Sequence, residues 1–460
     1  MQTSDTFNTP ITISAPETMP IWNAAMADYL RFRGSPIGDL KNIDDTAFLL
    51  GPVYCGVMKL LSGFDPQSNT VQKDLANARN AAPNVPANER LHLDAMEAMA
   101  AGNFSKAGHI WDTILTTRPH DVMALKGSHE SFFMVGALAD MLRSAKTALK
   151  AIDPNNAAYH VAVGQYAFAL EENGQYAEAE SYGRLGLSLE QEDCWSMHCL
   201  DHVYESQNRQ QDVMSLLKAN RPIWKEQNLL DAHIWWHLAL RLVEAEEFDA
   251  AMELFDNELA NIPANNQFRL TDSTSLLWRL ELSGVDVGNR WSAEADKWER
   301  YAETHSNPFL DMHAALAFAA TPDKQASARF FDTVKSAHQD STHEVGEIFR
   351  EVVHPLVDAI RLYPQDKKQA ASALAPLLPT FHRVGGSIVQ RQIVERSYSS
   401  ALIATGNHLS SAEFLDDKLK TAPNASWLLR DRAKASELAG DEKAATLYAR
   451  RADLMMAAWH

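Results

Sequence analysis

Apolar residues recur three and four positions apart along most of the chain, which predicts helices with one buried face. Over 157–191 this spacing runs through a first stretch, stops at Asn173-Gly174, and resumes with Tyr176 and Ala179 on one face. Because Asn-Gly is a turn signal that ends a helix, the segment is predicted to be two helices joined by a tight turn.

The same unit recurs along the chain. Gly102-Asn103-Phe104 repeats the pattern that begins at Gly174, and the two glycines lie 72 positions apart, which is two periods of about 36 residues. Further copies of the turn, each followed by a small or branched apolar residue, begin at Asn208 with Val213, Glu246 with Ala251 and Gly440 with Ala445. A period of about 34 residues with a small residue in the second helix is the signature of tetratricopeptide arrays.

These repeats predict an all-α fold, a tetratricopeptide-like helical-repeat superhelix or alpha-solenoid. Each helix pair exposes an apolar face that only the next pair covers, so the array buries its core by stacking. We expect N-terminal helical hairpins in 1–85, repeats carrying a histidine cluster in 86–260, and more degenerate repeats, with a C-terminal one, in 261–460. A loop is expected over 261–268, a helix over 271–283, and essentially no strand.

Charge and composition limit the kinds of partner that the protein is expected to bind. The net charge is −18, so the basic footprint of a nucleic-acid-binding protein is absent and an anionic membrane surface would repel the chain. The N-terminus shows no basic region followed by an apolar region, which is the pattern of a signal peptide. The sequence contains no run of about 18 apolar residues, so no membrane-spanning helix is predicted. Three cysteines give no disulfide framework. We therefore expect a soluble, cytoplasmic protein.

Two pairs of histidines carry the most distinctive chemistry. His198 and His202 lie four residues apart, as do His233 and His237, and each pair falls on a predicted helix. A spacing of four places both imidazoles of a pair on one helix face. Both helices are the first of their repeats and are expected to line the concave groove. At least three of the four imidazoles should therefore converge on one pocket.

Three interpretations of the cluster stay open. The first helices, at about 195–207 and 232–245, are expected to be neighbours, so four histidines could hold a divalent metal such as zinc. The same imidazoles could act as base and acid near pH 7 without a metal. They could also be solvated or bonded to the backbone with no chemical role. Asp201 or Glu205 could orient an imidazole or raise its pKa.

Other polar side chains are candidates for the same groove. Tyr204, Glu205 and Trp236 lie beside the histidines in sequence and are candidate ligand-binding residues, and Asp272 follows on a later helix. Trp278, on that same helix, is expected to be a core residue.

A second group of candidates lies nearer the C-terminus. Asp311 and His313 form an Asp-x-His at a helix start and are candidate catalytic residues, with Asp311 as a simple helix cap in the alternative interpretation. Ser387 is expected to cap a helix after Gly385-Gly386, where backbone donors and Arg391 could also meet an anion. Arg391 is expected to point to the same cavity as the histidines.

Together these motifs resemble the tetratricopeptide repeat protein 38 family. The matching segments, which span roughly 90 to 450, are His198-x-x-x-His202-Val-Tyr204-Glu205, His233-Ile-Trp-Trp236-His237-Leu-Ala239-Leu240, Phe248-Asp-x-Ala251, Leu277-Trp278-Arg279-Leu280-Glu281-Leu282, Asp311-x-His313 and Gly385-Gly386-Ser387 with Gln390-Arg391. The resemblance implies a helical repeat fold and the location of a site. It implies no settled reaction. Family members usually have a histidine where this chain has Ile388; if that histidine contacts substrate or metal in them, this chain has lost or altered one contact.

Two classes of function compete at this stage. The first is a hydrolase or lyase of small molecules, with or without a metal, that uses the four histidines with Asp272, Asp311 and His313. The second is a scaffold that binds a protein or peptide in the concave groove, although the groove positions carry histidine, tryptophan and acidic groups instead of the usual basic clamp. A weaker third is a protein that binds a cationic small molecule through Trp235 or Trp236 and Glu205.

Overall fold

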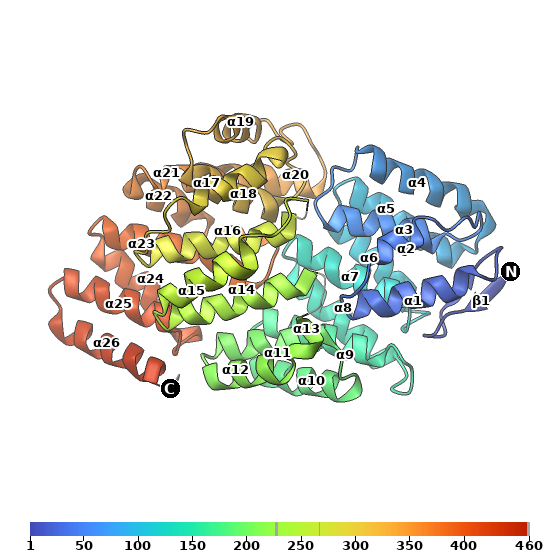
Figure 1. Cartoon of the computed structure of the whole chain (residues 1–460), viewed down its shortest axis with the longest axis horizontal. Coiled ribbons are helices and arrows are strands. Elements are labelled where there is room, and N and C mark those ends of the chain that lie inside the picture. Colours follow the sequence, from blue (N-terminus) through green and yellow to red (C-terminus); the bar gives the residue numbers. More distant parts are fainter. Residues whose placement is uncertain (226–228, 266, 458–460) are drawn as a thin grey trace. The chain divides into compact units, whose positions relative to one another are not determined.

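The computed structural model describes residues 1–225, 229–265 and 267–457, and helices dominate it (Figure 1). The predicted all-α class is confirmed at this level. The exception is a short antiparallel hairpin of β1 (Gln2–Ser4) and β2 (Pro10–Thr12), where helices were expected. The side chain of Ile11 in β2 is completely buried. Asp5 accepts hydrogen bonds from the backbone N–H groups of Phe7 and Thr9, and these bonds stabilise the connecting turn.

The chain forms two compact units. The first unit comprises 1–200, 222–231 and 340–348, and the second comprises 201–221, 232–339 and 349–460. The division falls inside one helix, after Leu200. The three segments expected from the sequence stay a prediction.

Consecutive helices of the first unit pack against one another. Its helices are α1 (Thr18–Leu30), α2 (Pro36–Leu40), α3 (Leu50–Leu61), α4 (Asn69–Ala81), η1 (Ala82–Asn84), α5 (Ala87–Ala100), α6 (Phe104–Leu115), α7 (Val122–Met134), α8 (Leu138–Ala151), α9 (Tyr159–Glu172), α10 (Tyr176–Leu189) and α20 (Glu344–Ile348). The helices α11 (Cys194–Ser206), α13 (Arg221–Trp224) and α14 (Leu229–Glu244) cross the division between the units.

The second unit contains the remaining helices, and α23 to α26 lie side by side in chain order (Figure 1). Its helices are α12 (Gln210–Ala219), α15 (Phe248–Leu254), η2 (Phe255–Leu259), α16 (Gln267–Leu282), α17 (Arg290–Trp298), η3 (Glu299–Tyr301), α18 (Pro308–Ala320), α19 (Gln325–Thr333), η4 (Phe349–Val353), α21 (His354–Leu362), α22 (Lys367–Leu374), η5 (Ala375–Leu377), η6 (Phe381–Val384), α23 (Ile388–Ala404), α24 (His408–Thr421), α25 (Ser426–Leu438) and α26 (Glu442–Ala457). The helix expected from 271 begins earlier, at Gln267, because Leu270 is buried and Phe268 stacks on Phe309. Residue 266 of the expected loop lies outside the described residues.

One turn recurs between paired helices. A residue with positive φ stands two positions before the second helix, at Gly102, Gly136, Gly174, Asn208, Glu246, Gly406 and Gly440. The first five of these lie alternately 34 and 38 positions apart. The next residue donates its N–H back into the preceding helix, as Gln175 does to the carbonyl of Leu170. This is the hydrogen bond of a Schellman motif, in which the left-handed residue ends one helix and turns the chain into the next.

The small or branched residue expected in the second helix of each pair packs as predicted at four positions. Ala107, Ala179, Val213 and Ala251 are completely buried. Ala445, in the last helix, is only half-buried. Small side chains at these positions let the two helices of a pair approach closely.

Among the described residues, none of the helices is both long and apolar enough to cross a bilayer.

Candidate metal centre

Two helices bring imidazoles and carboxylates together in the second unit. On α14, His233, His237 and Arg241 recur every four residues and therefore share one helix face. The C-terminal half of α11 contributes His202 and Glu205. Trp236 and neighbouring apolar residues of α14 are fully buried. Because the histidines lie on the same helix, the burial of these residues places the polar face in the interior as well.

Each histidine of α14 is oriented by a carboxylate. His233 Nδ1 lies 2.9 Å from Asp272 Oδ1, and His237 Nδ1 lies 2.8 Å from Glu205 Oε2. Glu205 is held in turn by an ion pair with Arg241. An ionised carboxylate only accepts hydrogen bonds, so both imidazoles carry their proton on Nδ1. This is the way in which carboxylates orient metal-binding histidines.

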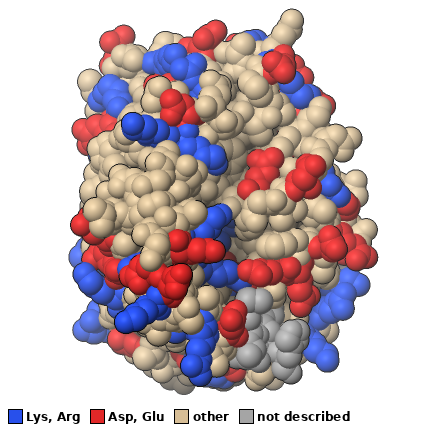
Figure 2. All heavy atoms as spheres, turned by 90° about the vertical axis from the view of Figure 1, so that its left-hand side faces the viewer, with Lys and Arg blue, Asp and Glu red and all other residues tan. Residues whose placement is uncertain are grey.

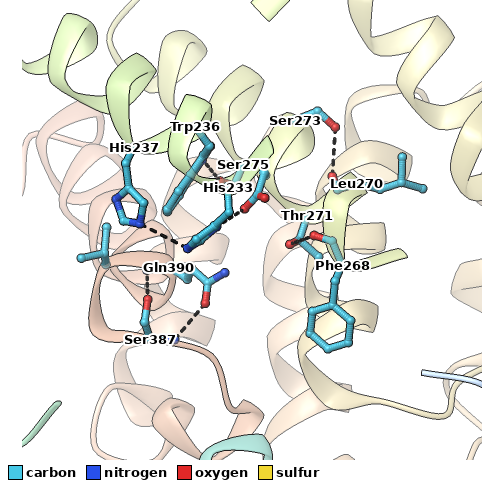
Figure 3. A network of polar contacts seen from close by, with 12 residues as sticks. His233, Trp236, His237, Phe268, Leu270, Thr271, Ser273, Ser275, Ser387 and Gln390 are labelled. Atoms are coloured by element: carbon cyan, nitrogen blue, oxygen red, sulfur yellow. Dashed lines mark hydrogen bonds and ion pairs between the residues drawn. The ribbon is translucent and has the colours of Figure 1, made fainter. Parts of the chain in front are cut away.

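The two Nε2 atoms then face each other. They lie 3.2 Å apart, and the two rings are nearly perpendicular (Figure 3). This is also a hydrogen-bond distance, and such a bond needs a proton on one of the two Nε2 atoms; with one proton per ring, held on Nδ1, two lone pairs face each other instead. Two nitrogens bound to one tetrahedral zinc ion at about 2.05 Å would be about 3.3 Å apart. The spacing therefore fits two ligands of one metal ion.

His202 completes a group of three imidazoles. Its ring centroid lies 4.8 Å from that of His237, and one nitrogen from each of His202, His233 and His237 lies within 4.8 Å of the others. The predicted convergence of at least three histidines is confirmed. His198 lies one turn earlier on α11 and is buried, but it belongs to the first unit.

Burial sets the protonation of the site. His202 and His237 are completely buried and His233 is 8% exposed. The pKa of His237 is held well below its usual value by burial first, and then by the neighbouring His233 and His202. Neutral imidazole is the form that binds a metal, so burial keeps His237 in the form that suits a metal ligand.

Asp201 is the least satisfied acid beside the histidines. Its Oδ2 lies 3.7 Å from His237 Nδ1, and neither of its oxygens has a hydrogen-bond partner among the described residues. Burial, followed by the charge of Glu205, raises the pKa of Asp201 well above its usual value. A carboxyl with a strongly raised pKa next to a cluster of imidazoles makes Asp201 a candidate functional residue.

Arg279 of α16 joins the cluster to the Gly-Gly-Ser segment, although more than a hundred residues separate them in sequence. Its guanidinium lies 5.4 Å from the ring centroid of Trp236, donates to Ser275 Oγ at 2.9 Å and donates to the carbonyl of Val389 at 2.7 Å. The same Ser275 hydroxyl accepts from Trp236 Nε1 at 2.9 Å (Figure 3). Two of the segments that carry the resemblance therefore contact each other in the folded chain.

The Gly-Gly-Ser segment itself is a helix cap. Ser387 and Gln390 form a reciprocal capping box at the start of α23, as expected for Ser387. Gln390 Oε1 accepts the backbone N–H of Ser387 at 2.9 Å, so that donor is not available to an anion. Arg391 is buried and donates to the carbonyl of Gly386. Its direction towards the histidines stays a prediction.

The Asp-x-His pair does not form one site. Asp311 accepts from His305 Nδ1 at 2.8 Å, whereas His313 Nδ1 donates to the carbonyl of Phe309 at 2.9 Å. Two residues apart on a helix, they point in different directions. Asp311 as the cap of α18 was wrong, because Asn307 accepts the N–H groups of Phe309 and Leu310. His313 lies close enough to Arg279 that, after burial, this charge helps to lower its pKa to about 3.

The remaining candidates have internal partners. Arg209 lies 4.4 Å from the ring centroid of Tyr204, and Trp236 is completely buried and stacks on His233. Because Arg279 already lies over Trp236, a cationic ligand has little support there. Trp278 is a core residue, as predicted, and donates to Ser397 Oγ.

Sequence reasoning gave no role at this site to two arginines. Arg241 had a detectable signal, because it continues the four-residue spacing of the histidines of α14. Arg279 was named only as part of a resembling segment, and nothing local showed its role because its partners come from segments distant in sequence. Figure 2 shows acidic and basic side chains interspersed over one face of the molecule, with no continuous basic surface in that view.

In a comparison with protein-family models, none matches this chain.

Proposed function

We propose that this chain is a tetratricopeptide-like helical-repeat protein that binds a divalent transition metal, preferably zinc, at His202, His233 and His237. The facing Nε2 atoms of His233 and His237, 3.2 Å apart with both Nδ1 atoms on carboxylates, carry the proposal. A proton could also bridge the two nitrogens, but burial and the neighbouring charges oppose a cationic His237. A metal ion relieves the repulsion between the lone pairs and suits neutral imidazoles.

The repeat architecture is part of the proposal. The recurring turn at spacings of 34 and 38 residues supports a tetratricopeptide-like superhelix. The meeting of Arg279 with Val389 supports the resemblance to the tetratricopeptide repeat protein 38 family, because it links two of the resembling segments. We take the superhelix to present the site to a groove.

The chemistry that we propose is a metal-assisted hydrolase or lyase reaction on a small molecule. A zinc ion bound by three imidazoles keeps a fourth position for water and lowers the pKa of that water, which supplies a nucleophile or base at neutral pH. Asp201 is the proton acceptor or donor beside it, because its pKa is raised and its oxygens accept no hydrogen bond from the described residues.

Elemental analysis of protein purified without a histidine tag tests the metal. We expect about one zinc ion per chain and its loss in His233→Ala and His237→Ala. His109→Ala, at an exposed position, is the matched control and keeps the metal. Protein that refolds or is purified with zinc present and still contains none contradicts the proposal, and the peptide-binding scaffold then becomes the better interpretation.

Asp201→Asn separates metal binding from catalysis. The variant is expected to keep its zinc and to lose hydrolysis of a generic activated ester at neutral pH, because the amide cannot exchange a proton. A variant that keeps both its zinc and its full hydrolysis excludes Asp201 as the proton donor or acceptor.

A further inference from the structure

A second site lies in the second unit, in a recess beside the N-terminal turn of α18. Trp298, Tyr301, His305, Asn307 and Asp311 are among its lining residues. The recess is partly enclosed and has room for a group of about the size of one water molecule. The proposed metal centre uses none of these side chains.

Asp311 is the unusual residue of this recess. It is only 5% exposed, and its Oδ1 accepts from His305 Nδ1 at 2.8 Å. Its Oδ2 is buried and has no hydrogen-bond partner among the described residues. Leaving a buried carboxylate oxygen without a donor costs its desolvation, so natural proteins usually supply a donor.

The imidazole beside Asp311 is held in place and cannot turn to supply that donor. His305 Nε2 lies 2.8 Å from Thr333 Oγ1, while the carbonyl of His305 accepts from His338 Nε2 at 2.7 Å. The backbone of His305 has a φ of 41°, in the left-handed region that a non-glycine residue rarely adopts. These contacts hold Asp311, which lines the recess, in place, and the described residues leave its Oδ2 unused as an acceptor.

The charges of the residues that line the recess indicate which kind of group would donate to Asp311 Oδ2. Among the described residues that line the recess, Asp311 is the one carboxylate, and Lys and Arg are absent. A cationic donor therefore fits better than a neutral one, and the ring of Trp298 adds an aromatic wall of the kind that ammonium groups favour. The available room limits the cation to a small head group.

We infer that the recess binds the primary ammonium group of a small molecule, with Asp311 Oδ2 as the acceptor. The ammonium would donate to Oδ2 and take the place of a single water molecule. This inference does not depend on the metal centre, since the two sites share no residue.

Thermal unfolding with methylammonium chloride tests the inference, with potassium chloride at equal ionic strength as the reference. Methylammonium is expected to raise the Tm of the wild type by about 1–2 °C in a saturable manner. Tetramethylammonium, which cannot donate a hydrogen bond and is too large, should give no such shift. In protein with ¹⁵N-labelled histidine, methylammonium should shift one imidazole signal that is missing in His305→Gln.

Asp311→Asn identifies the acceptor. The amide oxygen still accepts from His305, so the fold should be retained, but the ammonium response should vanish. Glu303→Gln is the matched control, because it removes a nearby carboxylate that is 61% exposed and paired with Arg329. An equal response to methylammonium and potassium, or a response that persists in Asp311→Asn, means that the recess holds only water and overturns the inference. If Asp311→Asn does not fold, the comparison of salts on the wild type still decides.

Discussion

Replacing Asp272 by asparagine tests whether a carboxylate orients a metal ligand. Asp272 is nearly fully buried on α16, and its Oδ1 accepts the Nδ1 proton of His233 at 2.9 Å. Asparagine has the same shape and can still accept through its amide oxygen. The substitution therefore removes the negative charge that makes the imidazole a better ligand, while the packing is preserved.

The expected effect is on metal affinity. Loss of a carboxylate behind a metal-binding histidine weakens metal binding by about 10–100-fold, which corresponds to about 1.4–2.8 kcal/mol. The stability of the metal-free protein should change much less, because the hydrogen bond to His233 is kept.

Competition with a zinc chelator of known affinity measures the zinc Kd, and chemical denaturation of the metal-free protein measures the free energy of unfolding. Glu294→Gln is the matched control. Glu294 is also a buried carboxylate that contacts α16, but it accepts from the hydroxyls of Ser273 and Thr274 and not from a histidine. A zinc Kd of Asp272→Asn within about twofold of the wild type, or an equal loss in Glu294→Gln, would refute the proposed role.

Three further predictions concern stability. Ser387→Ala removes the capping box of α23 and should lower the free energy of unfolding by about 1 kcal/mol in urea denaturation, and an unchanged midpoint would contradict that role. Below pH 6.5 the unfolded chain protonates His313, whereas the native side chain, with its pKa lowered to about 3, stays neutral. Its contribution is present above pH 6.5 and is lost as the pH falls, by up to about 1.4 kcal/mol per pH unit, and His313→Gln should reduce this slope in denaturation curves between pH 7 and 5. Gly102→Ala should destabilise more than Gly174→Ala by thermal denaturation, because both have positive φ but only at Gly102 would the added Cβ meet another side chain, that of His343, at 2.4 Å; equal losses would exclude this clash.

Local pattern was enough to predict the helices and the turns between them. The spacing of apolar residues and the turn residue before each second helix, which is Gly or Asn except at Glu246, depend on neighbours within one or two turns. These neighbours are close in sequence. The pairing of His233 with His237 was predictable for the same reason, because a spacing of four fixes a shared helix face. The N-terminal hairpin was missed because two strands of three residues give too short a pattern to detect.

The chemical environment of the histidines was decided by the tertiary structure. Glu205 and Asp272 reach His237 and His233 from other helices, and these contacts orient both Nδ1 protons. The spacing of two on α18 separates Asp311 from His313, but the partner of Asp311, His305, was decided by the tertiary structure. A sequence pattern gives the face on which a side chain lies, but the partner on that face belongs to another segment. The sequence alone therefore determined which imidazoles share a helix face, and only the packing of α11, α14 and α16 decided their protonation and their fit to a metal ion, because both depend on burial and on charges brought close by the fold.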